Sequence, residues 1–239
     1  MNPAQRLHAL GQSLWLDNIT RTMVADGTLA RYIDTIAVTG LTSNPTIFEQ
    51  AIAKGTAYDA AIREKAAAGL ADEALFFDLA IEDLSAAAQL FLPEFERTKG
   101  VDGWVSLEVS PLLADDAAGT VKAAIELHAR AAQPNLYIKI PGTPAGLQAI
   151  EDAIAAGVPV NVTLLFSADQ YLAAADAWLR GVERRIAAGL DADEDGVLDP
   201  EEISQTSYVC DGASAVATLV PLRNTAGGSS IRRPTVPSG

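Results

Sequence analysis

The segment "NLYIKIPGTPAGLQAIE" (135–151) joins a strand pattern directly to a helix pattern. Its first half, "NLYIKIP", consists mainly of residues that favour a buried strand, and Lys139 is the one charged residue in it. Pro144 follows Thr143 at a position suited to the first turn of a helix, and the Ala-rich run after it has helical spacing. The segment therefore predicts one strand–helix unit with a lysine in the strand.

The same alternation recurs along the chain. Strand-like runs occur at 13–19, 34–43, 103–110, 135–141 and 157–166, and helical patterns occur at 72–97, 115–133, 143–157 and 167–189. Strands that alternate with helices predict a parallel sheet with crossover helices. We expect an α/β fold of the TIM type, a (β/α) barrel with about five of the eight units. A doubly wound sheet is the alternative, but no glycine-rich dinucleotide fingerprint follows any strand.

Two regions of different character are expected. Residues 1–190 form the barrel portion, whereas residues 191–239 form an acidic loop and an irregular tail rich in Gly, Ser, Pro and Arg, which composition predicts to be disordered. Such a tail cannot supply three more strand–helix units of about 30 residues each. We therefore expect an incomplete barrel with two unpaired edges.

Composition limits the classes of function. The net charge of −14 argues against nucleic acid and anionic membranes as partners. No apolar run reaches the ~20 residues of a membrane span, and the N-terminus lacks a signal-peptide pattern. A single cysteine, Cys210, allows no internal disulfide, so a cytoplasmic location is expected.

Polar side chains recur near the carboxyl ends of the expected strands, where the active sites of barrels form. They are Asp17, Thr42 with Asn44, Glu108, Lys139, and Asn161 with Thr163. Because buried charges cost several kcal/mol unless they are paired, stability alone does not explain a lysine and two carboxylates there. A desolvated lysine amine beside carboxylates indicates Schiff-base chemistry with a carbonyl substrate.

Each of these residues also has a structural interpretation. Lys139 could be an exposed edge-strand lysine, Asp17 a helix N-cap, and Glu108 a structural ion-pair partner. Asn44, which precedes Pro45, could be an N-cap and a ligand at once. Asn161 and Thr163 could tie adjacent strands together.

Five segments resemble transaldolases of the bacterial type, over roughly residues 5–190. They are "LHALGQSLWLDNITR" (7–21), "TGLTSNPTIFEQAI" (39–52), "VSLEVSPLLADD" (105–116), "NLYIKIPGTPAGLQAIE" (135–151) and "GVPVNVTLLFSADQYLAAADAWLRGVERR" (157–185). Their order and length make the resemblance specific. A different Schiff-base aldolase would share the lysine but not the "TSNPTIF" and "NVT" pieces.

The resemblance implies a transferase of the pentose phosphate pathway that needs no cofactor. Lys139 would form an imine with a ketose phosphate, Asp17 would take and return the proton of the substrate hydroxyl, and Glu108 with Thr163 and a water would transfer protons during imine formation. Asn44 and Asn161 would bind the dihydroxyacetone hydroxyls, with Thr42 beside them. The implied reaction converts sedoheptulose 7-phosphate and glyceraldehyde 3-phosphate into erythrose 4-phosphate and fructose 6-phosphate.

The resemblance stops after "RIAAGLD", which ends at Asp191. A transaldolase is expected to continue with a strand that carries Ser and Arg and later with another Arg, which help to bind the substrate phosphate. No equivalent segment follows, and no motif supports this role for Arg223, Arg232 or Arg233. We therefore expect an atypical, truncated C-terminus without the phosphate-binding half.

The acidic loop "DADEDGVLDPEEI" (191–203) has the spacing of an EF-hand loop. Asp191, Asp193, Asp195 and Glu202 occupy ligand positions of that motif, so Ca²⁺ binding at 191–202 is one hypothesis and a solvated acidic loop is the other. The alternative function is thus a non-catalytic remnant that binds calcium. His8 and His128 lie in helical patterns without metal-ligand neighbours in the sequence, which predicts structural roles for both.

Overall fold

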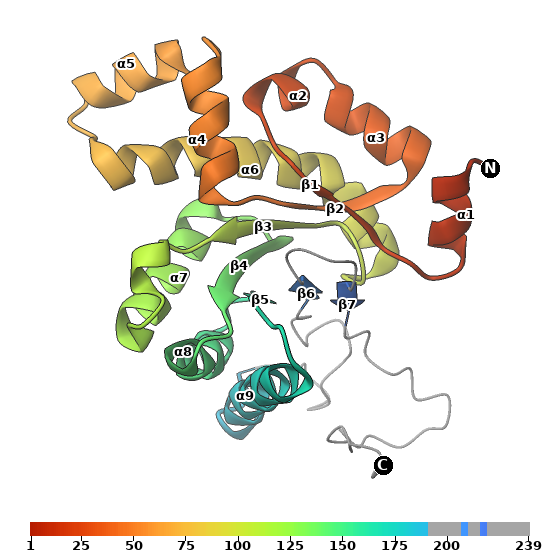
Figure 1. Cartoon of the computed structure of the whole chain (residues 1–239), viewed down its shortest axis with the longest axis vertical. Coiled ribbons are helices and arrows are strands. Elements are labelled where there is room, and N and C mark those ends of the chain that lie inside the picture. The colour runs from red at the N-terminus through yellow and green to blue at the C-terminus, as the bar shows by residue number, and fades with distance from the viewer. Residues whose placement is uncertain (191–206, 210–215, 219–239) are drawn as a thin grey trace. The chain divides into compact units, whose positions relative to one another are not determined.

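A computed structural model describes residues 1–190, 207–209 and 216–218 (Figure 1). The chain divides into two compact units, each of which is described by itself. The first comprises Met1–Val109 and Ala124–Lys139, and the second comprises Ser110–Ala123 and Ile140–Gly239. The boundary runs through a helix and through the strand that carries Lys139.

The first unit is built on parallel strands in the order β1-β2-β3-β4. These strands are β1 (Leu14–Asp17), β2 (Val38–Thr42), β3 (Trp104–Glu108) and β4 (Leu136–Pro141), whose last two residues belong to the second unit. The helices are α1 (Pro3–Ala9), α2 (Arg21–Ala25), α3 (Thr28–Ile36), α4 (Pro45–Lys54), α5 (Asp59–Ala67), α6 (Asp72–Thr98) and the second half of α7 (Ala117–Ala131). Every strand of this sheet is separated from the next by at least one helix, as parallel pairing requires.

The core of the first unit lies between the sheet and α6, which packs against β3 and β2 (Figure 1). One set of alternate strand residues supplies its apolar side, namely Leu41, Val105, Leu107, Leu136 and Ile138, all of which are buried. Asn135 fastens the layers together, because its Nδ2 donates to the carbonyls of Ala88 at 2.9 Å and Gly103 at 2.8 Å. The burial of these apolar residues fixes which side chains of each strand face α6, because a shift of one residue would turn them to the opposite face of the sheet.

The opposite face of the sheet holds a layer of aromatic rings. Tyr137 stacks on Trp104 with ring centroids 3.9 Å apart and faces Trp15 at 6.4 Å. Gly40, the partner of Trp15 in the β1–β2 register, leaves room for the indole, because a Cβ there would lie 2.4 Å from Trp15 Cε2. The glycine in "TGLTSNPT" is therefore needed for side-chain packing.

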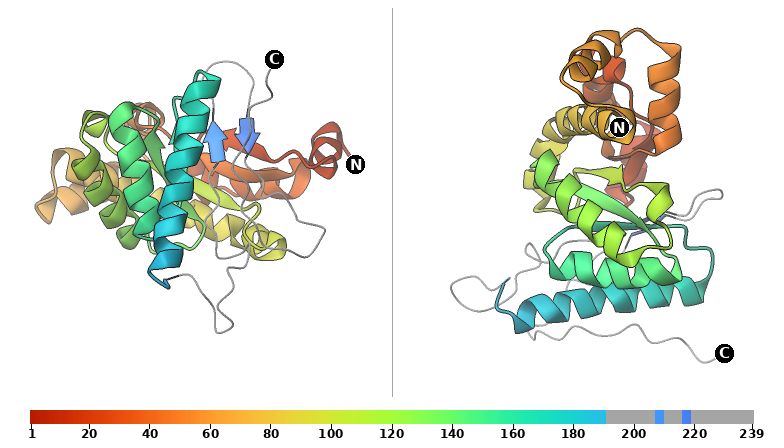
Figure 2. Two further views of the ribbon diagram at one scale, coloured as in Figure 1. Left: turned by 90° about the horizontal axis from the view of Figure 1, so that it is seen from below. Right: turned by 90° about the vertical axis from the view of Figure 1, so that its left-hand side faces the viewer.

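The second unit contains the 3₁₀ helix η1 (Pro111–Leu113), the first half of α7, α8 (Pro144–Ala155), β5 (Val160–Thr163) and α9 (Ala168–Ala187), followed by β6 (Ser207–Val209) and β7 (Val216–Thr218). Helices α8 and α9 lie side by side (Figure 2). Gly181 allows this approach, because a Cβ there would lie 2.7 Å from the Glu151 carbonyl oxygen. Strand β6 pairs in parallel with β5, and β7 runs antiparallel to β6.

The predicted α/β class and the five strands that alternate with helices are confirmed, as an incomplete TIM-type barrel. The strand predicted at 34–43 is wrong at its start, because Thr28–Ile36 is helical and Ala37 ends that helix in the left-handed conformation with φ 53°. The strand predicted at 157–166 is too long, since it ends at Thr163 and Leu164 has φ 61°. No helix among the described residues is long and apolar enough to cross a bilayer.

Replacing Gly40 by alanine should destabilise the first unit by about 1–3 kcal/mol, because the added methyl group collides with the Trp15 indole. Urea denaturation followed by tryptophan fluorescence measures this loss. Gly55→Ala is the matched control, because a Cβ at Gly55 meets no atom closer than 3.5 Å and that variant should unfold like the parent. Equal stability of the two variants would contradict the packing role of Gly40.

Candidate active site

The amine of Lys139 is the centre of the site in the first unit. Its side chain lies on the same face of β4 as Tyr137, and only 8% of the residue is exposed. Lys139 Nζ lies 3.2 Å from Glu108 Oε2 and donates to the Ser43 carbonyl oxygen at 2.8 Å. The interpretation of Lys139 as an exposed edge-strand residue is therefore wrong.

Strand register brings Glu108 to this lysine. Glu108 and Lys139 are Cα partners in the β3–β4 ladder, and the side chain of Glu108 is 25% exposed. A carboxylate that is partly hydrated and touches a buried amine can exchange a proton with it and with water. The ion pair expected for Glu108 exists, and its role in proton transfer stays a prediction.

The turn after β2 supplies a contact that sequence reasoning missed. Ser43 is almost completely buried, its Oγ donates to the Ser106 carbonyl oxygen at 2.8 Å, and its own carbonyl accepts from Lys139. The motif "TSNPT" contains this serine, but the group that accepts from Lys139 is its backbone carbonyl. Residue type therefore could not reveal the contact. Ser43 fixes where the lysine amine lies.

Asn44 begins α4 as expected. Its Oδ1 accepts from the Ile47 N–H at 3.0 Å, and Pro45 occupies the first helical position. The cap uses the oxygen of the amide and leaves the Nδ2 protons for another acceptor. The interpretation as a cap is confirmed, and a role in binding stays a prediction that this geometry permits.

Asp17 and Thr42 lie on adjacent strands as Cα partners of the β1–β2 ladder. Asp17 is exposed at the end of β1, and α2 is capped by Thr20, whose Oγ1 accepts from Met23, so the N-cap interpretation of Asp17 is wrong. Thr42 is buried, and its Oγ1 has no hydrogen-bond partner among the described residues. Both side chains are therefore free to meet a polar ligand.

Asn161 and Thr163 belong to β5 in the second unit, where both are buried. The carbonyl oxygen of Thr163 accepts from the Gly142 N–H at 2.8 Å, and a Cβ on Gly142 would lie 2.4 Å from Leu165 Cδ2. This turn fixes the carboxyl end of β5. The predicted roles of Asn161 and Thr163 stay predictions.

The calcium hypothesis concerns Asp191, Asp193, Asp195 and Glu202, which lie outside the described residues. It remains a prediction of the sequence pattern. Arg223, Arg232 and Arg233 also lie outside the described residues.

A buried lysine–glutamate pair at the carboxyl ends of parallel strands is typical of (β/α)-barrel proteins with a strand-borne catalytic lysine. The chain belongs to the Transaldolase/Fructose-6-phosphate aldolase family, whose sequence profile matches residues 14–218. The family drawn from the sequence motifs is thereby confirmed, but the expected end of the resemblance at Asp191 is wrong, because the match extends to residue 218.

Three curated relatives illustrate the similarity, and each is named "Transaldolase". The protein from Trichodesmium erythraeum is 42% identical over 193 residues, which are 81% of this chain and 51% of the relative. The protein from Mycolicibacterium smegmatis is 46% identical over 185 residues, 77% of this chain and 50% of the relative. That from Mycobacterium tuberculosis is 44% identical over 183 residues, 77% and 49% of the two chains. The chain spans about half the length of these relatives.

The Lys139–Glu108 pair should show strong coupling in a double-mutant cycle. Lys139→Met leaves the Glu108 carboxylate and the Ser43 carbonyl without their donor, and Glu108→Gln leaves a buried ammonium unpaired, so each should cost about 1–3 kcal/mol. The double variant should lose less than the sum of the two. Urea denaturation of the four proteins measures the coupling, and additive losses would mean that the pair does not interact.

Proposed function

We propose that this chain carries the Schiff-base centre of a transaldolase and transfers a dihydroxyacetone unit between sugar phosphates. The observation that carries the proposal is the buried Lys139 amine, 3.2 Å from Glu108, in a segment that belongs to the transaldolase family. The proposed donor is sedoheptulose 7-phosphate or fructose 6-phosphate, and the proposed acceptor is glyceraldehyde 3-phosphate or erythrose 4-phosphate. The pathway would be the pentose phosphate pathway, with a cytoplasmic location.

The first proposed step forms the imine. The neutral Lys139 amine attacks the C2 carbonyl of the ketose, and the carbinolamine loses its oxygen as water. Glu108 accepts the proton that the ammonium releases and returns a proton to the departing hydroxyl, with Thr163 and a water as proposed partners. The hydrogen bond to the Ser43 carbonyl directs the amine before the attack.

The second proposed step breaks the bond between C3 and C4. Asp17 takes the proton of the C4 hydroxyl, the bonding electrons move into the protonated imine, and the aldose phosphate leaves as an aldehyde. The enamine that stays on Lys139 then adds to the aldehyde of the acceptor while Asp17 returns its proton. Hydrolysis of the new imine releases the product. Since the iminium is the electron sink, the cycle needs no cofactor.

Binding of the three-carbon unit is proposed for the amides of Asn44 and Asn161, with Thr42 as a further hydroxyl partner. Support comes from the free Nδ2 of the Asn44 cap and from the Thr42 hydroxyl, which has no hydrogen-bond partner among the described residues. These groups donate to or accept from sugar hydroxyls without carrying charge.

Borohydride trapping tests the proposal. Incubation of the full chain with fructose 6-phosphate and borohydride should attach a reduced three-carbon unit to the peptide that contains Lys139, as read by mass spectrometry. Lys139→Met should remove the adduct, whereas Lys122→Met, which alters an exposed lysine of α7, should leave it unchanged. A folded protein without an adduct on Lys139 would overturn the proposal.

A substitution at Asp17 separates imine formation from cleavage. Asp17→Asn should still form the imine but should cleave C3–C4 at least about 100-fold more slowly, because the proton acceptor is missing. Mass spectrometry then finds the intact six-carbon adduct of fructose 6-phosphate in place of the three-carbon one. A three-carbon adduct at the parental rate would exclude Asp17 as the base.

A further inference from the structure

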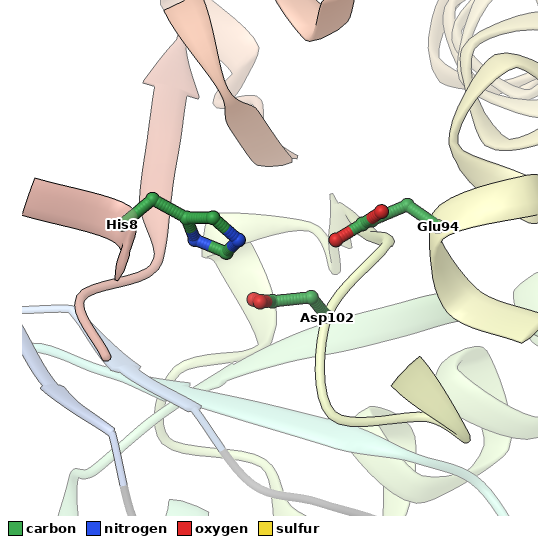
Figure 3. Close-up of side chains that lie close together, drawn as sticks. All are labelled: His8, Glu94 and Asp102. Atoms are coloured by element: carbon green, nitrogen blue, oxygen red, sulfur yellow. The ribbon is translucent and has the colours of Figure 1, made fainter. Parts of the chain in front are cut away.

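A second cluster of polar side chains lies in the first unit, apart from the residues assigned to catalysis. His8 comes from α1, Glu94 from the last turns of α6, and Asp102 from the connection between α6 and β3. One atom of each, a ring nitrogen or a carboxylate oxygen, lies within 4.8 Å of the other two. Figure 3 shows the imidazole and the carboxylate of Glu94 facing each other, with the carboxylate of Asp102 close by. The sequence gives His8 no metal-ligand neighbours, because Glu94 and Asp102 lie more than eighty residues further along the chain.

The three side chains do not satisfy one another. Among the described residues, neither carboxylate makes a hydrogen bond or ion pair with His8, although the three groups converge. Ligands of one zinc ion, each about 2.1 Å from the metal, lie about 3.4 Å apart in a tetrahedron. A closure of at most about 1.4 Å would therefore bring this cluster to the spacing of a metal site.

The hydrogen bonds of Asp102 among the described residues involve its backbone and not its carboxylate. Only 6% of the residue is exposed, and Thr98 engages its backbone, because Thr98 Oγ1 accepts from the Asp102 N–H at 2.9 Å. Within the described part of the chain, no donor makes a hydrogen bond or ion pair with its carboxylate. A carboxylate that makes no direct hydrogen bond or ion pair can act as a ligand for a cation, and the nearby charge of Arg97 acts on it only at longer range.

The connection that presents Asp102 is held rigidly. Gly103 adopts φ 87°, its N–H donates to the Thr39 carbonyl at 2.7 Å, and a Cβ there would lie 2.3 Å from the backbone nitrogen of Phe95. Trp104 Nε1 donates to the Gly100 carbonyl at 2.8 Å. A ligand on such a frame is positioned before any ion arrives.

His8 is oriented in the way that metal ligands usually are. Its Nδ1 lies 3.4 Å from the Gln12 carbonyl oxygen, an acceptor that requires the proton on Nδ1. The lone pair is then on Nε2, the ring nitrogen that Figure 3 shows on the side of Glu94. A hydrogen bond from the second ring nitrogen to a carbonyl typically fixes the tautomer of a metal-bound histidine.

The charges of the cluster also permit a bound cation. Glu94 is paired with Arg97, whose side chain is 61% exposed, so one of the two negative charges is compensated by a group that can turn into water. That hydrogen bond to Glu94 is the main reason why the pKa of Arg97 is raised. Arg97 also acts on Asp102 through its charge, but no ion pair joins the two among the described residues, so the carboxylate of Asp102 is available to an ion.

We propose that His8, Glu94 and Asp102 bind one divalent transition-metal ion, and that this ion fastens α1 to the connection between α6 and β3. One imidazole nitrogen and two carboxylate oxygens match the preference of zinc, whereas calcium takes six to eight oxygen ligands. The fourth position of the tetrahedron is open to water. The site lies where β3 begins, so its role is structural.

The weak attachment of α1 supports this role. None of the seven residues of α1 is buried, and Leu7 is exposed. The helix contacts α3, and its N-cap Asn2 donates from Nδ2 to the Thr35 carbonyl oxygen at 2.5 Å. A short helix with few anchors frays in water, and a metal bond through His8 would hold it in place.

Zinc titration of the full chain against a chromophoric chelator, with excess Ca²⁺ to occupy the acidic segment, tests the site. The parent should bind one zinc ion, and His8→Gln and Asp102→Asn should each weaken that binding at least about 10-fold. Three control variants should retain parental affinity, namely His128→Gln, Cys210→Ser and Asp193→Asn/Asp195→Asn. Binding that survives His8→Gln, or no binding at micromolar zinc, would overturn the proposal.

Hydrogen exchange adds a readout that is independent of affinity. Zinc should slow the exchange of the α1 amides in the parent and in His128→Gln but not in His8→Gln. Circular dichroism verifies that each variant is folded, and Glu94→Gln replaces Asp102→Asn if the latter unfolds. Zinc bound without protection of α1 would contradict the structural role.

Discussion

A lysine amine that is withdrawn from water must be given acceptors, and this constraint organises the first unit. Lys139 on β4 meets the Ser43 carbonyl after β2 and the Glu108 carboxylate on β3, so three strands must keep one register for the amine to be satisfied. A slip by one residue would point the lysine at the apolar side chains that face α6. The amine of Lys139 can therefore be buried with its acceptors only when the three strands are correctly paired.

The aromatic layer lies on the same face of the sheet as the amine. Tyr137 and Trp104 stack two residues before Lys139 and four residues before Glu108, at the amino ends of their strands. Gly40 admits Trp15 to this layer. Rings that fill this side of the sheet below the lysine leave the polar groups gathered at the carboxyl ends, as in a barrel whose interior is packed. The packing that stabilises the unit thus also decides at which end chemistry can occur.

The positions of polar residues along the expected strands were enough to predict much of this arrangement. The sequence places Lys139, Glu108 and Thr42 near the carboxyl ends of three expected strands, and the register of the ladders shows that they share one face. The sequence pattern could not predict the contact between Lys139 and the Ser43 carbonyl, because a main-chain carbonyl has no signature in the sequence. It also failed at 34–36, where apolar and β-branched residues form the end of a helix, and only the left-handed Ala37 marks the boundary. A short apolar run fits both the helical period of 3.6 residues and the strand period of 2, so the local pattern does not distinguish a helix from a strand.

The His8 cluster shows a different limit of sequence reasoning. His8 is separated by more than eighty residues from Glu94 and Asp102, and no spacing rule connects them. A sequence motif can predict a metal site only when one helix or loop carries the ligands, as the calcium hypothesis for the acidic run at 191–202 assumes. Here the ligands meet because β1 and β3 both pair with β2, which brings α1 at the start of one strand near the connection at the start of the other. In the first unit the strand order therefore creates two sets of convergent polar groups, one at each end of the same strands. Barrel architecture assigns chemistry to the carboxyl ends and stability to the amino ends, and the Lys139 pair and the His8 cluster follow that division.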